Sequence, residues 1–91
     1  MNKKYVFDTS AIFVYTKAEE GSDTIEEILK LSKEGKCIVY ISFITLMEIY
    51  YITWQERDED IAKEIIVLVK SLPIEIIESI YRIILSSLRI K

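Results

Sequence analysis

The sequence predicts a single α/β domain with a parallel sheet flanked by helices. Three short β-prone runs, at residues 4–7, 37–41 and 74–77, alternate with longer stretches whose apolar residues recur at helical spacing. The chain has 91 residues, is 51 % hydrophobic and contains only two Gly and one Pro, which favours one packed core. The predicted order is β-α-α-β-α-α-β-α, with right-handed crossovers and one domain over residues 1–91.

The first predicted strand, at residues 4–7, is apolar and ends at Asp8. Thr9 and Ser10 follow it, and hydroxyl side chains of this kind cap helices by accepting a hydrogen bond from a backbone N–H group. We therefore expect a short helix that they cap and that runs to about Lys17.

The second helix and the second strand carry their own boundary signals. Asp23 followed by Glu26 resembles a capping box, and Gly35 is a typical residue just after the end of a helix. Residues 37–41 form a continuous β-branched and aromatic run, which predicts a buried strand. Ser42 comes directly after this run and is expected to cap the third helix.

The second half of the chain repeats the pattern. The third helix is predicted over residues 43–57, and a fourth begins at Asp58 or Asp60. Pro73 ends that helix because proline lacks the N–H group that a helix interior requires. Residues 74–77 read as the third strand, and a last helix is expected from there to the end of the chain.

Composition excludes several functions. The net charge is −3 with no basic stretch, which argues against binding nucleic acid through a broad cationic surface. The absence of histidine excludes Ser-His-Asp and Cys-His catalysis and the usual zinc sites.

Cys37 has no partner for an internal disulfide, and no signal peptide is visible, so we expect a cytoplasmic protein. The run 37–55 contains Glu48 and several hydroxyls, so we expect no membrane helix. Plentiful Lys, Glu and Ile fit a thermophilic source.

Two isolated carboxylates are the candidate site. Glu48 is the only charged residue between Lys36 and Glu56, so we expect it to be desolvated unless it is paired or bound to a cation. Asp8 ends the first strand, and ligands of parallel α/β sheets collect at the carboxyl ends of the strands. If the first two strands are neighbours, both acids can approach one Mg²⁺ or Mn²⁺ ion. Glu78, after the third strand, is a weaker candidate for the same edge.

Structural explanations compete with each of these assignments. Asp8 could simply cap a helix, and Glu48 could face a solvent gap or pair with an arginine. The aromatic residues Tyr50, Tyr51 and Trp54 fit a core or a dimer interface better than a platform for base stacking. An unrelated small α/β domain, in which the acids are only caps, is a further alternative.

Two segments resemble motifs of a known family. Residues 5–12, Tyr-Val-Phe-Asp-Thr-Ser-Ala-Ile, resemble the opening of a PIN domain, and residues 41–49, Ile-Ser-Phe-Ile-Thr-Leu-Met-Glu-Ile, resemble its second motif. The resemblance implies a Mg²⁺- or Mn²⁺-dependent endoribonuclease that acts on single-stranded RNA. It is closest to the small toxins of prokaryotic toxin–antitoxin pairs, which implies an antitoxin protein as a partner. Asp8 and Glu48 match the family's first two metal-binding acids.

The resemblance also defines what this chain lacks. Ser10 matches a hydroxyl position near the family's site, with Thr9 as its neighbour, but the third and fourth acids and the last strands have no counterpart here. In the family's sheet order, 3-2-1-4-5, their loss makes the first strand an exposed edge, which favours pairing with another chain. We therefore expect a homodimer or higher oligomer and a catalytically incomplete ribonuclease, or alternatively a non-catalytic interaction module that binds an antitoxin or itself.

Overall fold

The computed structural model describes residues 3–78 and has the predicted α/β architecture. Its elements, in chain order, are β1 (Lys3–Val6), α1 (Thr9–Thr16), α2 (Ser22–Lys33), β2 (Cys37–Ser42), α3 (Phe43–Glu56), α4 (Glu59–Ser71) and β3 (Glu75–Ile77). The predicted last helix, and the question of further strands, lie outside the described residues. No helix in the described range is long and apolar enough to cross a membrane.

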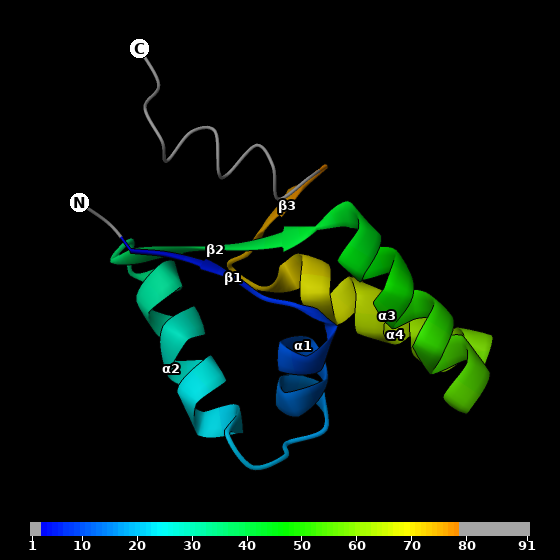
Figure 1. Cartoon of the computed structure of the whole chain (residues 1–91). Helices are drawn as coiled ribbons and strands as arrows, with labels where there is room; N and C mark the ends of the chain where they lie inside the picture. Colours follow the sequence, from blue (N-terminus) through cyan, green and yellow to red (C-terminus); the bar gives the residue numbers. More distant parts are fainter. Residues whose placement is uncertain (1–2, 79–91) are drawn as a thin grey trace.

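The three strands form one parallel sheet in the order β1-β2-β3 (Figure 1). The first two strands are therefore neighbours, which is the condition for a shared site of Asp8 and Glu48, and β1 is an edge of the described sheet. Val6 is paired with Tyr40 in the register of β1 and β2. The Phe7 N–H group donates to the Tyr40 carbonyl at 2.9 Å, which carries the pairing one residue beyond β1.

The helices cover one face of the sheet (Figure 1). Both connections, from β1 to β2 and from β2 to β3, move in the same direction across the sheet, so right-handed crossovers place them on the same side. Burial along β2 agrees with this arrangement. Cys37, Val39 and Ile41 are buried against the helices, whereas Ile38 and Tyr40 between them are only half-buried.

The core lies between β2 and the helices and consists largely of branched aliphatic side chains. Ile12 of α1, Ile41 of β2 and Ile49 of α3 are fully buried. Burying one such side chain stabilises the fold by about 1.5–3 kcal/mol. Val69 connects α4 to this core, but Leu68, which the helical spacing predicts on the core side, is exposed.

The ends of α2 show one prediction confirmed and one wrong. Gly35 has φ +78°, and the N–H groups of Gly35 and Lys36 donate to the carbonyls of Ser32 and Leu31, which is the Schellman arrangement. The predicted capping box is absent: Gly21, with φ +96°, occupies the N-cap position without a side-chain hydrogen bond. The helix thus begins before the expected cap residue, because a glycine can adopt the left-handed conformation that this entry requires.

The start of α4 resolves the choice between two aspartates. The Asp58 carboxylate accepts a hydrogen bond from the Ile61 N–H group at 2.8 Å, so Asp58 is the N-cap, and Asp60 lies in the first turn. The helix ends at Ser71, two residues before Pro73. This end is expected because a proline disfavours the helical conformation in the residue that precedes it.

Candidate metal site

Asp8 lies at the junction of β1 and α1 and is the N-cap of α1. Its Oδ1 atom accepts a hydrogen bond from the Ala11 N–H group at 2.9 Å, and its side chain is exposed. The prediction that Thr9 or Ser10 caps this helix is therefore wrong by one or two residues. Thr9 is the first residue of α1 and is half-buried, and Ser10 follows it with an exposed side chain. All three belong to the first turn of α1 or its cap.

Ser42 is the last residue of β2 and the N-cap of α3. Its buried Oγ atom accepts a hydrogen bond from the Thr45 N–H group at 3.0 Å and lies 3.0 Å from the Thr45 hydroxyl. When the pairing of Val6 with Tyr40 is continued by two residues, Asp8 comes level with Ser42. The caps of α1 and α3 therefore both lie at the carboxyl edge of the sheet, after two neighbouring strands.

Glu48 extends from α3 near this edge but is not buried. It lies six residues after the cap, which is about 9 Å along the helix axis, and the Cα–Cβ bonds of a helix tilt back toward its N-terminus. The expected desolvation of Glu48 is wrong, because its side chain is exposed. The apolar run around Glu48 predicts burial only if apolar residues lie solely on the inner side of the helix. However, α3 also carries apolar residues on its outward side, including Met47, which is 53 % exposed.

Glu78 also belongs to this edge by its position in the chain. It directly follows Ile77, which is paired with Ser42, and its side chain is exposed. Nevertheless, within residues 3–78 no three acidic, Cys or His side chains are gathered into a set that could hold a metal ion. The structure thus brings the Asp8 cap and the start of the Glu48 helix to one edge without building a three-ligand cluster.

The donor set determines which cation could fit. Mg²⁺ commonly keeps several waters and binds through one or two carboxylates, so Asp8 and Glu48 suit a weak, hydrated site. One oxygen of Asp8 already accepts the cap hydrogen bond, which leaves its other oxygen for a cation. The positive end of the α1 dipole at the same place opposes a bound cation by about 0.3–1 kcal/mol. Only weak binding is therefore expected from these two acids.

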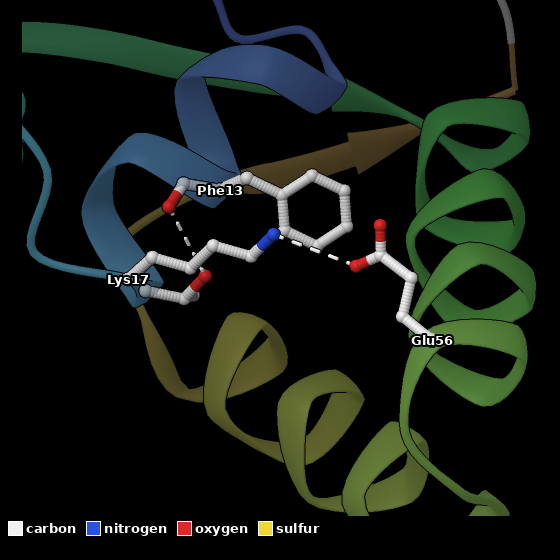
Figure 2. Close-up of polar contacts among 4 residues, drawn as sticks. Phe13, Lys17 and Glu56 are labelled. Carbon is white, nitrogen blue, oxygen red and sulfur yellow. Dashed lines mark hydrogen bonds and ion pairs between the residues drawn. The ribbon is translucent and has the colours of Figure 1, made fainter.

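A second polar cluster, which sequence reasoning missed, joins the ends of α1 and α3. Figure 2 shows the Lys17 ammonium between the Phe13 ring and the Glu56 carboxylate. The ammonium nitrogen lies 4.7 Å from the ring centroid and 3.5 Å from Glu56 Oε2. Both charged side chains are about half exposed, so the ion pair contributes less than about 1 kcal/mol. Its role is to tie the two helices together.

Behind this ion pair is a cavity of about 220 Å³ between α1, α3 and α4, lined in part by Phe13, Lys17 and Thr53. The Thr53 hydroxyl is buried and has no hydrogen-bond partner in the part of the chain that is described. Two threonines, Thr45 and Thr53, lie among apolar residues on the buried side of α3, and this pattern is the sequence signal that could have drawn attention to the position.

Comparisons with protein-family models, with curated proteins and with solved structures found no match to this chain.

Proposed function

We propose that this chain is a PIN-like ribonuclease domain that cleaves single-stranded RNA slowly, with a divalent cation held by Asp8 and Glu48. The observation that carries the proposal is the shared edge. The Asp8 cap and the beginning of the helix that bears Glu48 lie at the carboxyl ends of two neighbouring parallel strands. This is where open α/β sheets place their ligands.

Mg²⁺ or Mn²⁺ is the cofactor that this proposal requires. When bound, such a cation would activate water and offset the charge of a phosphodiester. The chain contains no histidine, so no imidazole could activate the water instead. Asp8 and Glu48 would hold the cation. The exposed Ser10 hydroxyl, next to the less exposed Thr9, would hydrogen-bond to the RNA phosphate or to a water of the cation.

Slow turnover follows from what the chain itself supplies. The net charge of −3 repels an RNA backbone, so the substrate depends on the cation for attraction. Two carboxylates hold a cation less firmly and orient it less strictly than a set of four acids. We therefore expect cleavage well below the usual range of enzymes, whose turnover has a median near 10 s⁻¹.

The test is cleavage of a single-stranded RNA that carries a fluorophore and a quencher, with Mn²⁺ and with EDTA. Asp8→Asn and Glu48→Gln are each expected to remove the metal-dependent signal. Two matched controls are expected to retain it: Asp58→Asn alters the equivalent cap of α4, and Glu64→Gln alters an exposed acid of α4. Cleavage that persists in either site variant, or that is lost equally in the controls, would contradict the assignment.

A non-catalytic role is the second candidate. The observation that favours it is the lack of a three-ligand acidic set in residues 3–78, together with the exposed apolar side chains of α3. In this alternative the domain binds an antitoxin protein or another copy of itself. Absence of RNA cleavage at every Mn²⁺ concentration, combined with saturable 1:1 binding of a purified antitoxin in calorimetry, would favour this function over the nuclease.

A further inference from the structure

The cavity between α1, α3 and α4 contains a buried hydroxyl that has no hydrogen-bond partner. Thr53 lines this cavity of about 220 Å³, and only 5 % of the residue is exposed. Its Oγ1 atom finds no donor or acceptor within the described residues. By contrast, the Thr16 hydroxyl, which belongs to the same lining, donates to the Phe13 carbonyl at 3.5 Å. Thr53 is therefore a polar group that a bound molecule could satisfy, as donor or as acceptor.

The rest of the inner lining is apolar, and the cavity is large enough for one substituted ring. Phe13 of α1 and Ile61 and Ile65 of α4 line it, and all three are partly buried. An engineered apolar cavity of about 150 Å³ binds benzene. The present cavity, of about 220 Å³, therefore has room for a ring that carries substituents. Such a lining selects a ligand that is mostly apolar and bears a hydrogen-bonding group.

Charged side chains stand at the outer end of the cavity. Lys17 and Glu56 belong to the lining and pair with each other across 3.5 Å, so neither charge is left over (Figure 2). Arg57 also lines the cavity and is exposed, and in the described part of the chain its guanidinium forms no ion pair. With two cations and one acid, the lining has a net positive charge. A guanidinium binds a carboxylate through two parallel hydrogen bonds, so the outer end suits a carboxylate.

Threonine at position 53 lowers the stability of the free protein. Valine has nearly the same shape, and both side chains are branched at Cβ, but valine buries no hydroxyl. A buried hydroxyl without a partner is destabilising, so valine would give a more stable fold. Residues that a fold tolerates at a cost in stability are typical of functional sites. A ligand therefore explains this hydroxyl better than packing does.

We propose that the cavity binds a small hydroxyaryl carboxylate, a molecule with one aromatic ring, a phenolic hydroxyl and a carboxylate. The ring lies against Phe13 and the α4 isoleucines, the phenol hydrogen-bonds to Thr53, and the carboxylate binds Arg57. Arg57 follows Thr53 by four residues, which is about 6 Å along the helix axis, so the two groups can hold opposite ends of one ring. The site is separate from the edge that bears Asp8, which caps the other end of α1, and it is independent of nuclease activity.

Nuclear magnetic resonance titrations of the isotope-labelled full chain test the assignment. The probe is para-hydroxyphenylacetate, and the matched probes are phenylacetate, which lacks the phenol, and para-cresol, which lacks the carboxylate. We expect the wild type to bind para-hydroxyphenylacetate with a Kd of about 0.1–5 mM, as suits a ligand of this size. Each truncated probe is expected to bind about tenfold more weakly. The amide signals that shift should belong to the facing parts of α1, α3 and α4.

Variants separate the two polar contacts. Thr53→Val is expected to bind para-hydroxyphenylacetate about tenfold more weakly, and no better than phenylacetate, while its Tm rises, because only the bound state uses the hydroxyl. Thr53→Ser retains the hydroxyl and is expected to retain the preference for the phenol. Arg57→Gln is expected to lose the preference for para-hydroxyphenylacetate over para-cresol. Lys70→Gln changes a cation of α4 outside the lining and is expected to keep both preferences.

Three results would overturn the proposal. The first is a wild type whose signals do not respond to any of the three probes at tenfold above the expected Kd, which would leave water as the occupant of the cavity. The second is a Thr53→Val variant that distinguishes para-hydroxyphenylacetate from phenylacetate as the wild type does, since the hydroxyl would then not contact the ligand. The third is a loss of stability in Thr53→Val, which would mean that the hydroxyl already has a partner within the chain.

Discussion

Asp8 has one observed role and one proposed role, and substitution can separate them. Its carboxylate caps α1 through a 2.9 Å hydrogen bond from Ala11, and it is also proposed to bind a cation. Asp8→Ala removes the cap, which costs about 1 kcal/mol, and the favourable interaction with the helix dipole, which adds about 0.5 kcal/mol. Asp8→Asn retains the cap because asparagine caps as well as aspartate does, so only the dipole contribution is lost.

The two variants therefore differ in stability but agree in metal binding. For a domain of this size, 1 kcal/mol corresponds to about 4–8 °C in Tm. Thermal unfolding in EDTA, followed by circular dichroism, is expected to show Asp8→Ala lower than the wild type by about 6–12 °C and Asp8→Asn by about 2–4 °C. Neither variant is expected to gain thermal stability from added Mn²⁺, whereas the wild type gains stability as the cation binds the folded state.

Asp58 provides the matched control because it caps α4 in the same way, through a 2.8 Å hydrogen bond from Ile61. Asp58→Ala is expected to lose as much stability as Asp8→Ala and to keep the response to Mn²⁺. A response of Asp8→Asn to Mn²⁺ equal to that of the wild type would refute the metal-binding role of Asp8. Equal stability of Asp8→Ala and Asp8→Asn would refute its capping role, since the cap would then contribute nothing.

Three further predictions concern the framework around the site. Thr53→Val is expected to raise the free energy of unfolding by up to about 1 kcal/mol in urea titrations, because it replaces an unpaired buried hydroxyl with a methyl group; a loss of stability would reveal a hidden partner. Ile49→Val is expected to lower the free energy of unfolding by about 0.5–1.5 kcal/mol, and Ile44→Val is expected to leave it almost unchanged. The reason is that Ile49 is fully buried whereas Ile44 is 68 % exposed. Equal losses in urea titrations would contradict this pattern of burial on α3. A double-mutant cycle of Lys17→Met and Glu56→Gln is expected to give a coupling below about 1 kcal/mol, and a larger value would show that the ion pair is less hydrated than its exposure indicates.

The sequence predicts the elements of this fold well because their signals are local. Short β-prone runs of β-branched and aromatic residues predict all three strands, Ser42 and Asp58 cap their helices, and Gly35 closes α2. The errors arise where two local signals compete. At α2 the conformational freedom of Gly21 prevails over a capping box, and at α1 the aspartate prevails over the hydroxyls that follow it.

The site is less predictable because exposure depends on tertiary packing. The apolar run around Glu48 indicates burial, yet a helix packed on one side leaves its other side in solvent whatever its composition. Glu48 lies on that exposed side, next to Met47. The neighbouring positions of β1 and β2 agree with the sheet order that the family resemblance implies. The cluster of Phe13, Lys17 and Glu56 could not be predicted, because it depends on how two helix ends meet.

Direct titration with Mn²⁺, followed by the loss of the free-ion signal in electron paramagnetic resonance, tests the central claim that Asp8 and Glu48 share one cation. We expect one weak site in the wild type, retained in Asp58→Asn and Glu64→Gln and lost in both Asp8→Asn and Glu48→Gln. Loss in only one of the two site variants, or wild-type binding in both, would show that these carboxylates do not hold a cation together.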